Sequence, residues 1–324
     1  MPVFLPFAGC PSRCLYCAQN LQTAMGMPDI RGVLAEAEAM LVRREREGRP
    51  PAEAAFYGGT FTAQREAPFE LCLAAAGKWM SQGLIHLWRC STRPDSLDAS
   101  RLERMRAAGC TCIELGVQSF EDSVLEASLR GYGGEAAARA VGRVRDGGFL
   151  CGVQLLPGLP GSTASGFVRD VKLAVELGAG LLRFYPCLVV RSTGLARLYE
   201  AGLYRPWDVP ATIEALARGL AVASLAMVPV TRIGVAYEPE FEPHVLAGPR
   251  DPDLGTRVRS RALILAVKRH LPPGAKIARA VFPRQAGGYL YGHRREAAPA
   301  LAALGLDAGT VCWHDSPQVL LETE

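Results

Sequence analysis

Three cysteines stand close together near the amino terminus of the 324-residue chain. Cys10, Cys14 and Cys17 lie within eight residues, directly after a short apolar run. Thiolates are soft ligands that select zinc or iron–sulfur clusters. A structural zinc site needs four ligands, but the next cysteine is Cys72 and the first histidine is His86. Three thiolates on a four-iron cluster would leave one iron open to a substrate or cofactor. The alternative is three ordinary buried cysteines.

A glycine pair marks a second candidate site. Gly58, Gly59 and Thr60 follow the apolar run 54–57. Paired glycines after a strand let the backbone approach a ligand closely, although a plain tight turn is the alternative.

Further polar residues lie within or just after later apolar runs. Ser91, Gln118, Arg130 and Gln154 are among them. Arg130 could instead be a surface charge at the end of a helix. Glu114 falls inside an apolar run and is costly to bury unless it is paired. An ion pair with Arg93 or Arg183 is as good an interpretation of it as a chemical role.

Short apolar runs alternate with longer amphipathic stretches through the first 190 residues. This alternation predicts parallel strands joined by helical crossovers. We expect a partial (β/α)6 TIM-type barrel, incompletely closed, with a lateral opening for a large substrate. The candidate residues then gather at the carboxyl ends of the strands, where such barrels carry their active sites. The predicted strands cover residues 3–7, 54–57, 85–90, 112–117, 150–156 and 181–185.

The alternation of short apolar runs and amphipathic stretches ends after residue 186. Residues 228–235 have the pattern of another strand, and the stretch 238–252 is rich in proline and charge. We place a boundary there, with a barrel domain over 1–237 and a small basic α/β extension over 238–324. Residues 250–295 hold 11 lysines and arginines against two aspartates, a net charge of +9 in 46 residues. Such a surface could bind RNA, and a solvated basic face is the alternative.

The cysteine spacing C-x3-C-x2-C, with the aromatic Tyr16 before the last cysteine, resembles the radical S-adenosylmethionine (SAM) superfamily. The segments GGTFT, STRPD, IELGVQS and YP make the likeness closer to the branch that holds the Elongator catalytic subunit and oxygen-independent coproporphyrinogen oxidase. The resemblance covers about residues 1–200. It implies a [4Fe–4S] cluster that reductively cleaves SAM to a 5′-deoxyadenosyl radical, which takes hydrogen from a substrate.

The resemblance also implies roles for single residues. Cys10, Cys14 and Cys17 match the cluster ligands, which carry the catalysis. The glycine pair and Thr60 match the contact to the methionine moiety, and Gln118 and Arg130 match cofactor contacts. Ser91 and Gln154 stand where relatives have carboxylates, so their ribose contacts depart from the pattern. Tyr16 could cover the cluster and adenine, or could belong to the core.

The substrate stays open, with tRNA or another RNA as one class. We expect no complete Elongator reaction, because the chain shows neither a glycine-rich acetyl-coenzyme A loop nor an acetyltransferase domain. The expected partner is an electron donor such as flavodoxin or ferredoxin. Two alternatives stay open: a non-catalytic iron–sulfur or haem-handling protein on the same fold, and a zinc-stabilised nucleic-acid-binding protein.

Composition restricts the class of protein. The chain is 49% hydrophobic and 21% charged, which is typical of a folded chain and excludes a disordered one. No apolar stretch reaches the roughly 20 residues that a membrane helix needs. The segment Ala8-Gly9-Cys10 resembles a lipoprotein cleavage site, but no lysine or arginine precedes it. We therefore expect a cytoplasmic protein without a membrane partner.

Overall fold

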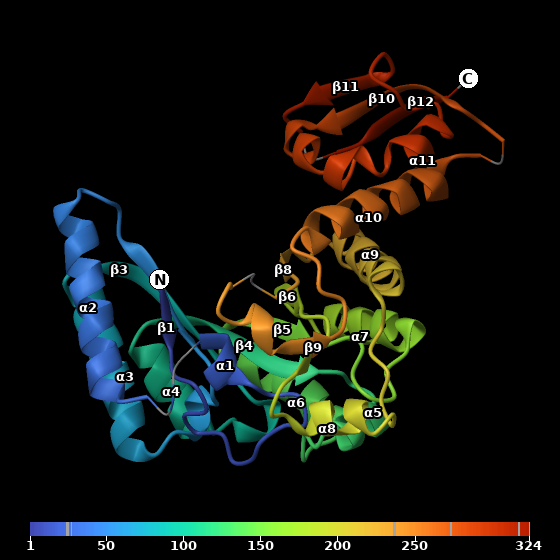
Figure 1. The fold of residues 1–324 in the computed structure, drawn as a ribbon. Coiled ribbons are helices and arrows are strands. Elements are labelled where there is room, and N and C mark those ends of the chain that lie inside the picture. The colour runs from blue at the N-terminus through green and yellow to red at the C-terminus, as the bar shows by residue number, and fades with distance from the viewer. Residues whose placement is uncertain (24–25, 27, 236–237, 273, 317, 324) are drawn as a thin grey trace.

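The structure, a computed structural model, describes residues 1–23, 26, 28–235, 238–272, 274–316 and 318–323. Seven parallel strands form its main sheet, which curls into a half-barrel (Figure 1). The strands lie side by side across the sheet in the same order as they follow one another in the sequence. From edge to edge the strands are β1 (Pro2–Phe4), β2 (Ala52–Tyr57), β3 (Ile85–Thr92), β4 (Cys110–Gln118), β5 (Leu150–Leu155), β6 (Leu181–Phe184) and β8 (Val230–Ile233).

The predicted fold class, a partial parallel α/β barrel, is confirmed. The structure adds a seventh strand, because β8 pairs in parallel with β6. The first strand is shorter than the predicted run 3–7. It ends at Phe4 because Pro6 has no N–H for the ladder and Phe7 has a φ of +59°. β1 and β8 are the two edges of the sheet, so the barrel is open between them.

Helices return the chain between the strands and pack on the sheet. Asp29, Asp98, Thr163 and Asp208 cap four of them, each accepting a hydrogen bond from a backbone N–H of the first turn. The long helices are α2 (Ile30–Arg46), α3 (Glu66–Ser81), α4 (Ala99–Ala107), α6 (Gly134–Asp146), α7 (Ala164–Glu176) and α9 (Val209–Leu225). The shorter elements are α1 (Gln19–Thr23), α5 (Asp122–Ala127), α8 (Gly194–Glu200), β7 (Val189–Val190) and β9 (Val245–Ala247).

The main hydrophobic core lies between the sheet and these helices. Phe56 of β2 contacts Trp79 of α3 and Trp88 of β3, with ring centroids 6.3 and 5.5 Å apart, and all three side chains are buried. Burying each such ring stabilises the fold by roughly 1.5–3 kcal/mol. This core fixes the strands, and the strands in turn place the polar residues at their carboxyl ends.

The carboxyl-terminal part forms a small lobe at the end of helix α10 (Leu254–His270) (Figure 1). Leu254 and Val258 of α10 belong to the main core. Ile264 and Val267, further along the same helix, belong to a second core that α10 shares with the lobe. The boundary at residue 238 stays a prediction. Strand β10 (Ile277–Pro283) pairs in parallel with β11 (Val311–His314) and antiparallel with β12 (Leu320–Thr323). The lobe also holds the short helix α11 (Ala298–Ala302).

The helices of the described residues are all too short or too polar to cross a bilayer.

Candidate functional site

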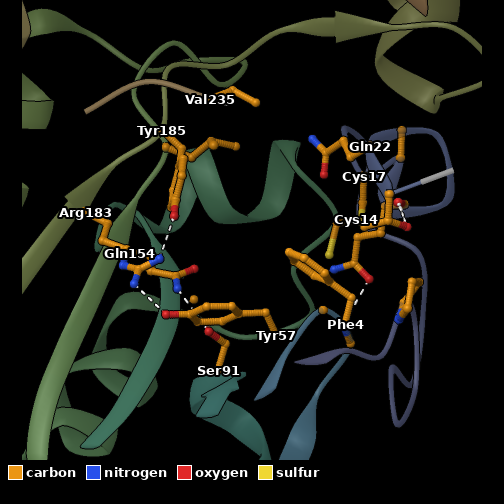
Figure 2. A pocket seen from close by; sticks show the side chains of 18 of the residues that line it. Phe4, Cys14, Cys17, Gln22, Tyr57, Ser91, Gln154, Arg183, Tyr185 and Val235 are labelled. Atoms are coloured by element: carbon orange, nitrogen blue, oxygen red, sulfur yellow. Dashed lines mark hydrogen bonds between the residues drawn. The ribbon is translucent and has the colours of Figure 1, made fainter. Parts of the chain in front are cut away.

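A cavity of about 900 Å³ lies at the open half-barrel. Figure 2 shows Cys14, Cys17 and Phe4 on one side of it. Arg183, Tyr185 and Gln154 lie on the other side, with Tyr57 and Ser91 between the two. The candidate cluster and cofactor residues all line this one cavity: Cys10, Cys14, Tyr16, Cys17, Gly58, Gly59, Thr60, Ser91, Gln118, Arg130 and Gln154. Strands far apart in the sequence bring them together.

The cysteine loop runs between β1 and α1. The Cys17 N–H donates to the Cys14 carbonyl at 3.1 Å, and the sulfur of Cys10 lies 3.4 Å from the hydroxyl of Thr60. Burial raises the pKa of Cys17 to about 12 and also raises the pKa of Cys10. Metal ligation would therefore displace protons from these thiols. In the described part of the chain, no three Cys, His, Asp or Glu side chains have the arrangement of a ready-made metal site.

Cys14 differs from the other two cysteines in its surroundings. Its sulfur accepts a hydrogen bond from Nη1 of Arg130 at 2.9 Å, and Nη1 of Arg93 lies 3.6 Å away. Positive guanidinium groups favour a negatively charged thiolate. The donor chemistry of the loop therefore fits an iron–sulfur cluster: three thiols line one cavity, and fixed cations lie where ligand charge would develop.

Arg130 is buried, with only 4% of its surface exposed, so the surface-charge alternative is wrong. It follows α5 and points back into the half-barrel. Its Nη1 also donates to the Tyr16 hydroxyl at 3.1 Å, and its Nη2 donates to the Gly116 carbonyl at 2.5 Å and to the Tyr132 hydroxyl at 2.6 Å. Burial raises the pKa of Tyr16 well above its usual value. Tyr16 is thereby tied to the arginine beside the cysteine loop.

The glycine pair packs against the segment that precedes Cys10. Gly59 has a φ of +63°, and a Cβ there would lie 2.2 Å from the Ala8 carbonyl oxygen. Gly58 has a φ of +80° and would contact Leu5 backbone at 3.2 Å. Both conformations favour glycine. The glycine pair therefore lets β2 pack closely against the segment before the cysteine loop, and the predicted close approach to a ligand stays a prediction.

Gln19 was missed by the sequence analysis. Its Oε1 accepts hydrogen bonds from the Phe7 N–H at 2.8 Å and from the Gly59 N–H at 3.0 Å. It thus joins the entry of the cysteine loop to the glycine pair. A glutamine two residues beyond the last cysteine gives no signal by itself, because nothing in the sequence shows which backbone groups need an acceptor.

Gln118 lies at a strained exit from β4. Its φ is +71°, and the register with β5 shifts between Leu115 and Gln118. Such irregularities near a strand end redirect a side chain. The turn that follows is fixed by Asp170 of α7. Its carboxylate accepts hydrogen bonds from the Ser119 hydroxyl at 2.7 Å and from the Phe120 N–H at 2.9 Å. Burial raises the pKa of Asp170 to about 6.

Charged and polar residues line the inner face of the half-barrel. Glu114 is fully buried, and its carboxylate lies 2.9 Å from Nε of Arg183 and 3.4 Å from Nη1 of Arg89. The predicted pairing with Arg183 is confirmed. The pairing with Arg93 is wrong, because the short loop after β3 turns Arg93 toward Asp95 and Cys14.

The two ribose candidates contact one another. Nε2 of Gln154 donates to the Ser91 hydroxyl at 3.2 Å and to Glu114 at 2.9 Å. Tyr57 accepts a hydrogen bond from Arg183 at 2.6 Å (Figure 2) and donates to Glu114 at 3.1 Å. Burial raises the pKa of Tyr57 beyond its usual range. Glu114 thus connects residues of the cavity wall into one network.

Comparison with known families agrees with this geometry. The model of the Radical SAM superfamily matches residues 4–174, just over half of the chain. The chain belongs to the radical SAM superfamily. A second model, the Radical_SAM C-terminal domain, matches residues 180–263. The chain is therefore a radical SAM enzyme whose cofactors are a [4Fe–4S] cluster and SAM, and members of this superfamily generally need a reductant. This membership favours the enzyme over the non-catalytic and zinc-stabilised alternatives.

Curated relatives carry the same family resemblance. The tRNA uridine(34) acetyltransferase of Methanocaldococcus infernus is 27% identical over 252 residues, which cover 64% of this chain and 46% of that protein. Elongator complex protein 3 of Mus musculus is 35% identical over 137 residues, which cover 40% of this chain and 24% of that protein. The predicted likeness to the Elongator branch is confirmed. The chain spans less than half the length of these relatives.

Solved structures show the same fold. The Elp3 of Methanocaldococcus infernus with an N-terminal deletion superposes with a TM-score of 0.62 at 21% identity, covering 84% of this chain and 64% of that chain. The coproporphyrinogen III oxidase HemN of Escherichia coli superposes with a TM-score of 0.53 at 19% identity. The match covers 69% of this chain and 52% of that chain.

Proposed function

We propose that Cys10, Cys14 and Cys17 bind the cluster and leave one iron to SAM. The observation that supports this most is that one cavity is lined by all of the candidate cluster and cofactor residues. When bound, the cluster and SAM would supply the radical chemistry for abstracting a hydrogen atom from a substrate C–H bond. The chain itself must orient SAM, exclude water and hold the substrate against it.

The cavity walls suggest how the chain does this. Gly58, Gly59 and Thr60 would face the amino-acid end of SAM beside the cysteine loop. Ser91 and Gln154 would bond the ribose hydroxyls, since a hydroxyl and an amide can both do so. Gln118, redirected by its strained backbone, would contact the cofactor from β4. Arg130 would lie beside the cluster, because its Nη1 donates hydrogen bonds to Cys14 and Tyr16.

The substrate proposal is RNA, with tRNA as the first class to test. It is supported by curated relatives named for tRNA uridine modification and Elongator, and by the basic carboxyl-terminal stretch. Part of that stretch is neutralised, because five of its eleven cations have a carboxylate partner: Arg250, Arg257, Arg261, Arg279 and Arg284. The other six have no carboxylate within 4.0 Å among the described residues. They are Arg259, Lys268, Arg269, Lys276, Arg294 and Arg295.

A flavodoxin or ferredoxin is the proposed electron donor, and the cytoplasm is the proposed location. Both can be tested with the purified protein and with fractionated cells.

Iron binding tests the ligand assignment. The cysteines are replaced by alanine one at a time, and iron and sulfide are measured after anaerobic reconstitution. Cys187→Ala is the matched control, because Cys187 lines the same cavity outside the motif. We expect each motif variant to lose the four-iron cluster and the control to keep it. A Cys14→Ala chain with full iron would refute the assignment.

RNA binding is tested on the anaerobic protein by titration with tRNA at several salt concentrations. We expect an affinity that falls as salt rises, because phosphate contacts release counterions. Reversing Arg294 and Arg295 to glutamate should weaken binding. Binding that is absent at low salt would remove RNA as the substrate class.

A further inference from the structure

Two guanidinium groups, one from the loop after β3 and one from the loop after α5, meet at one cysteine sulfur. Arg130 Nη1 donates to Cys14 Sγ at 2.9 Å, and Arg93 Nη1 lies 3.6 Å from the same sulfur. Neither Cys10 nor Cys17 has an arginine hydrogen bond to its sulfur among the described residues. The three thiols are therefore electrostatically unequal.

Both guanidinium groups are held in place by contacts other than Cys14. Asp95 grips Arg93 through two hydrogen bonds of 2.9 and 2.7 Å, and Arg93 Nη2 donates to the Arg130 carbonyl at 2.5 Å. Arg130 is fixed by Gly116 and Tyr132. Arg93 and Arg130 are 5% and 4% exposed. These contacts keep both guanidinium groups in place when the charge on the Cys14 sulfur changes.

A fixed cation beside a cluster ligand affects the cluster's reduction. One-electron reduction adds negative charge to the cluster and its sulfur ligands. Hydrogen bonds and positive charge at a ligand sulfur stabilise the reduced form and raise the reduction potential. The effect is strong where burial lowers the dielectric constant.

We propose that Arg93, together with Arg130, sets the reduction potential of the cluster through Cys14. This inference rests on the proposed function, because it requires Cys14 to ligate iron. Arg93 acts through the sulfur and is a positioning residue, not a catalytic one. Asp95 contributes to the same effect, because it orients Arg93 and partly offsets the positive charge of its guanidinium group.

The test is an EPR-monitored redox titration of the reconstituted full-length chain, anaerobic and without SAM. Arg93→Gln removes one cation and should shift the midpoint potential to more negative values. Asp95→Asn removes the opposing anion and should shift it to less negative values. Arg43→Gln, on the exposed face of α2, should leave it unchanged. General loosening of the loop would not give shifts of opposite sign.

Arg93→Lys keeps the charge without the planar guanidinium group, and should shift the potential less than Arg93→Gln. This variant also serves if Arg93→Gln does not fold. Iron and sulfide are counted in every sample, which separates two kinds of failure. A wild-type chain without a four-iron cluster overturns the proposed function and this inference with it. Loaded Arg93 variants with the wild-type midpoint overturn this inference alone.

Discussion

The side-chain oxygen of Gln19 accepts a hydrogen bond from the backbone N–H of Gly59 at 3.0 Å. The same oxygen accepts from the Phe7 N–H. One amide therefore links the two backbone segments that flank the cysteine loop, and it does so beside the cavity where SAM is proposed to bind.

Replacing Gln19 by leucine should loosen this link. Two backbone donors would lose their acceptor, and each unmet buried donor costs about 1–3 kcal/mol. We expect lower unfolding free energy and faster loss of iron from the reconstituted protein. Gln22→Leu is the control, since Gln22 lines the same cavity and belongs to the same short helix. Equal stability and iron retention in the two variants would show that Gln19 does not hold the loop.

Gly59→Ala should be far more costly than another glycine substitution with a similar backbone. Gly48 has a φ of +68° and no atom within 4 Å of the position that an added methyl group would take, whereas at Gly59 the methyl group would meet the Ala8 carbonyl. Gly48→Ala should cost about 1–2 kcal/mol from its conformation alone. Gly59→Ala should cost several kcal/mol and displace the cysteine loop. Urea denaturation of both variants measures the difference, and similar midpoints would contradict the packing argument.

Glu114→Gln should destabilise the half-barrel by about 3 kcal/mol or more, because Arg183 and Arg89 would lose their buried counter-charge. Glu135→Gln removes the acid of an exposed helical pair with Arg139 and should change stability by less than about 0.5 kcal/mol. Both values come from equilibrium unfolding. A Glu114→Gln chain as stable as the Glu135 variant would mean that the inner ion pairs contribute nothing.

Asp170 should give the protein a pH-dependent stability. Its pKa is raised to about 6 in the folded chain and is about 3.9 when unfolded. The folded state therefore binds this proton more tightly, and stability falls as pH rises from about 4 to 6. The loss is on the order of 3 kcal/mol, and it levels off above pH 6.

Asp170→Asn removes this titration. The difference in unfolding free energy between wild type and variant should fall between pH 4 and pH 6 and then stay constant. A difference that does not vary with pH would show that Asp170 is not the titrating group.

The sequence predicted the sheet because its buried strands are continuous apolar runs, and it predicted the cavity because motifs at parallel strand ends must converge. β8 was recognised as a strand but was not placed in the sheet, because the regular strand–helix alternation ends after residue 186 and β7, α8 and α9 lie between β6 and β8. Pairings that depend on side-chain direction were harder. Arg93 was one of two candidate partners for Glu114 but turns to Cys14, and Gln19 carries no local signal for its two backbone partners.

Formation of 5′-deoxyadenosine tests the central claim most directly. The reconstituted chain is incubated anaerobically with dithionite and SAM, and the products are separated by chromatography. We predict 5′-deoxyadenosine from wild type and from Cys187→Ala, and none from the Cys10, Cys14 or Cys17 alanine variants. A loaded wild-type protein that leaves SAM intact, or a Cys14→Ala protein that cleaves it, would contradict the account.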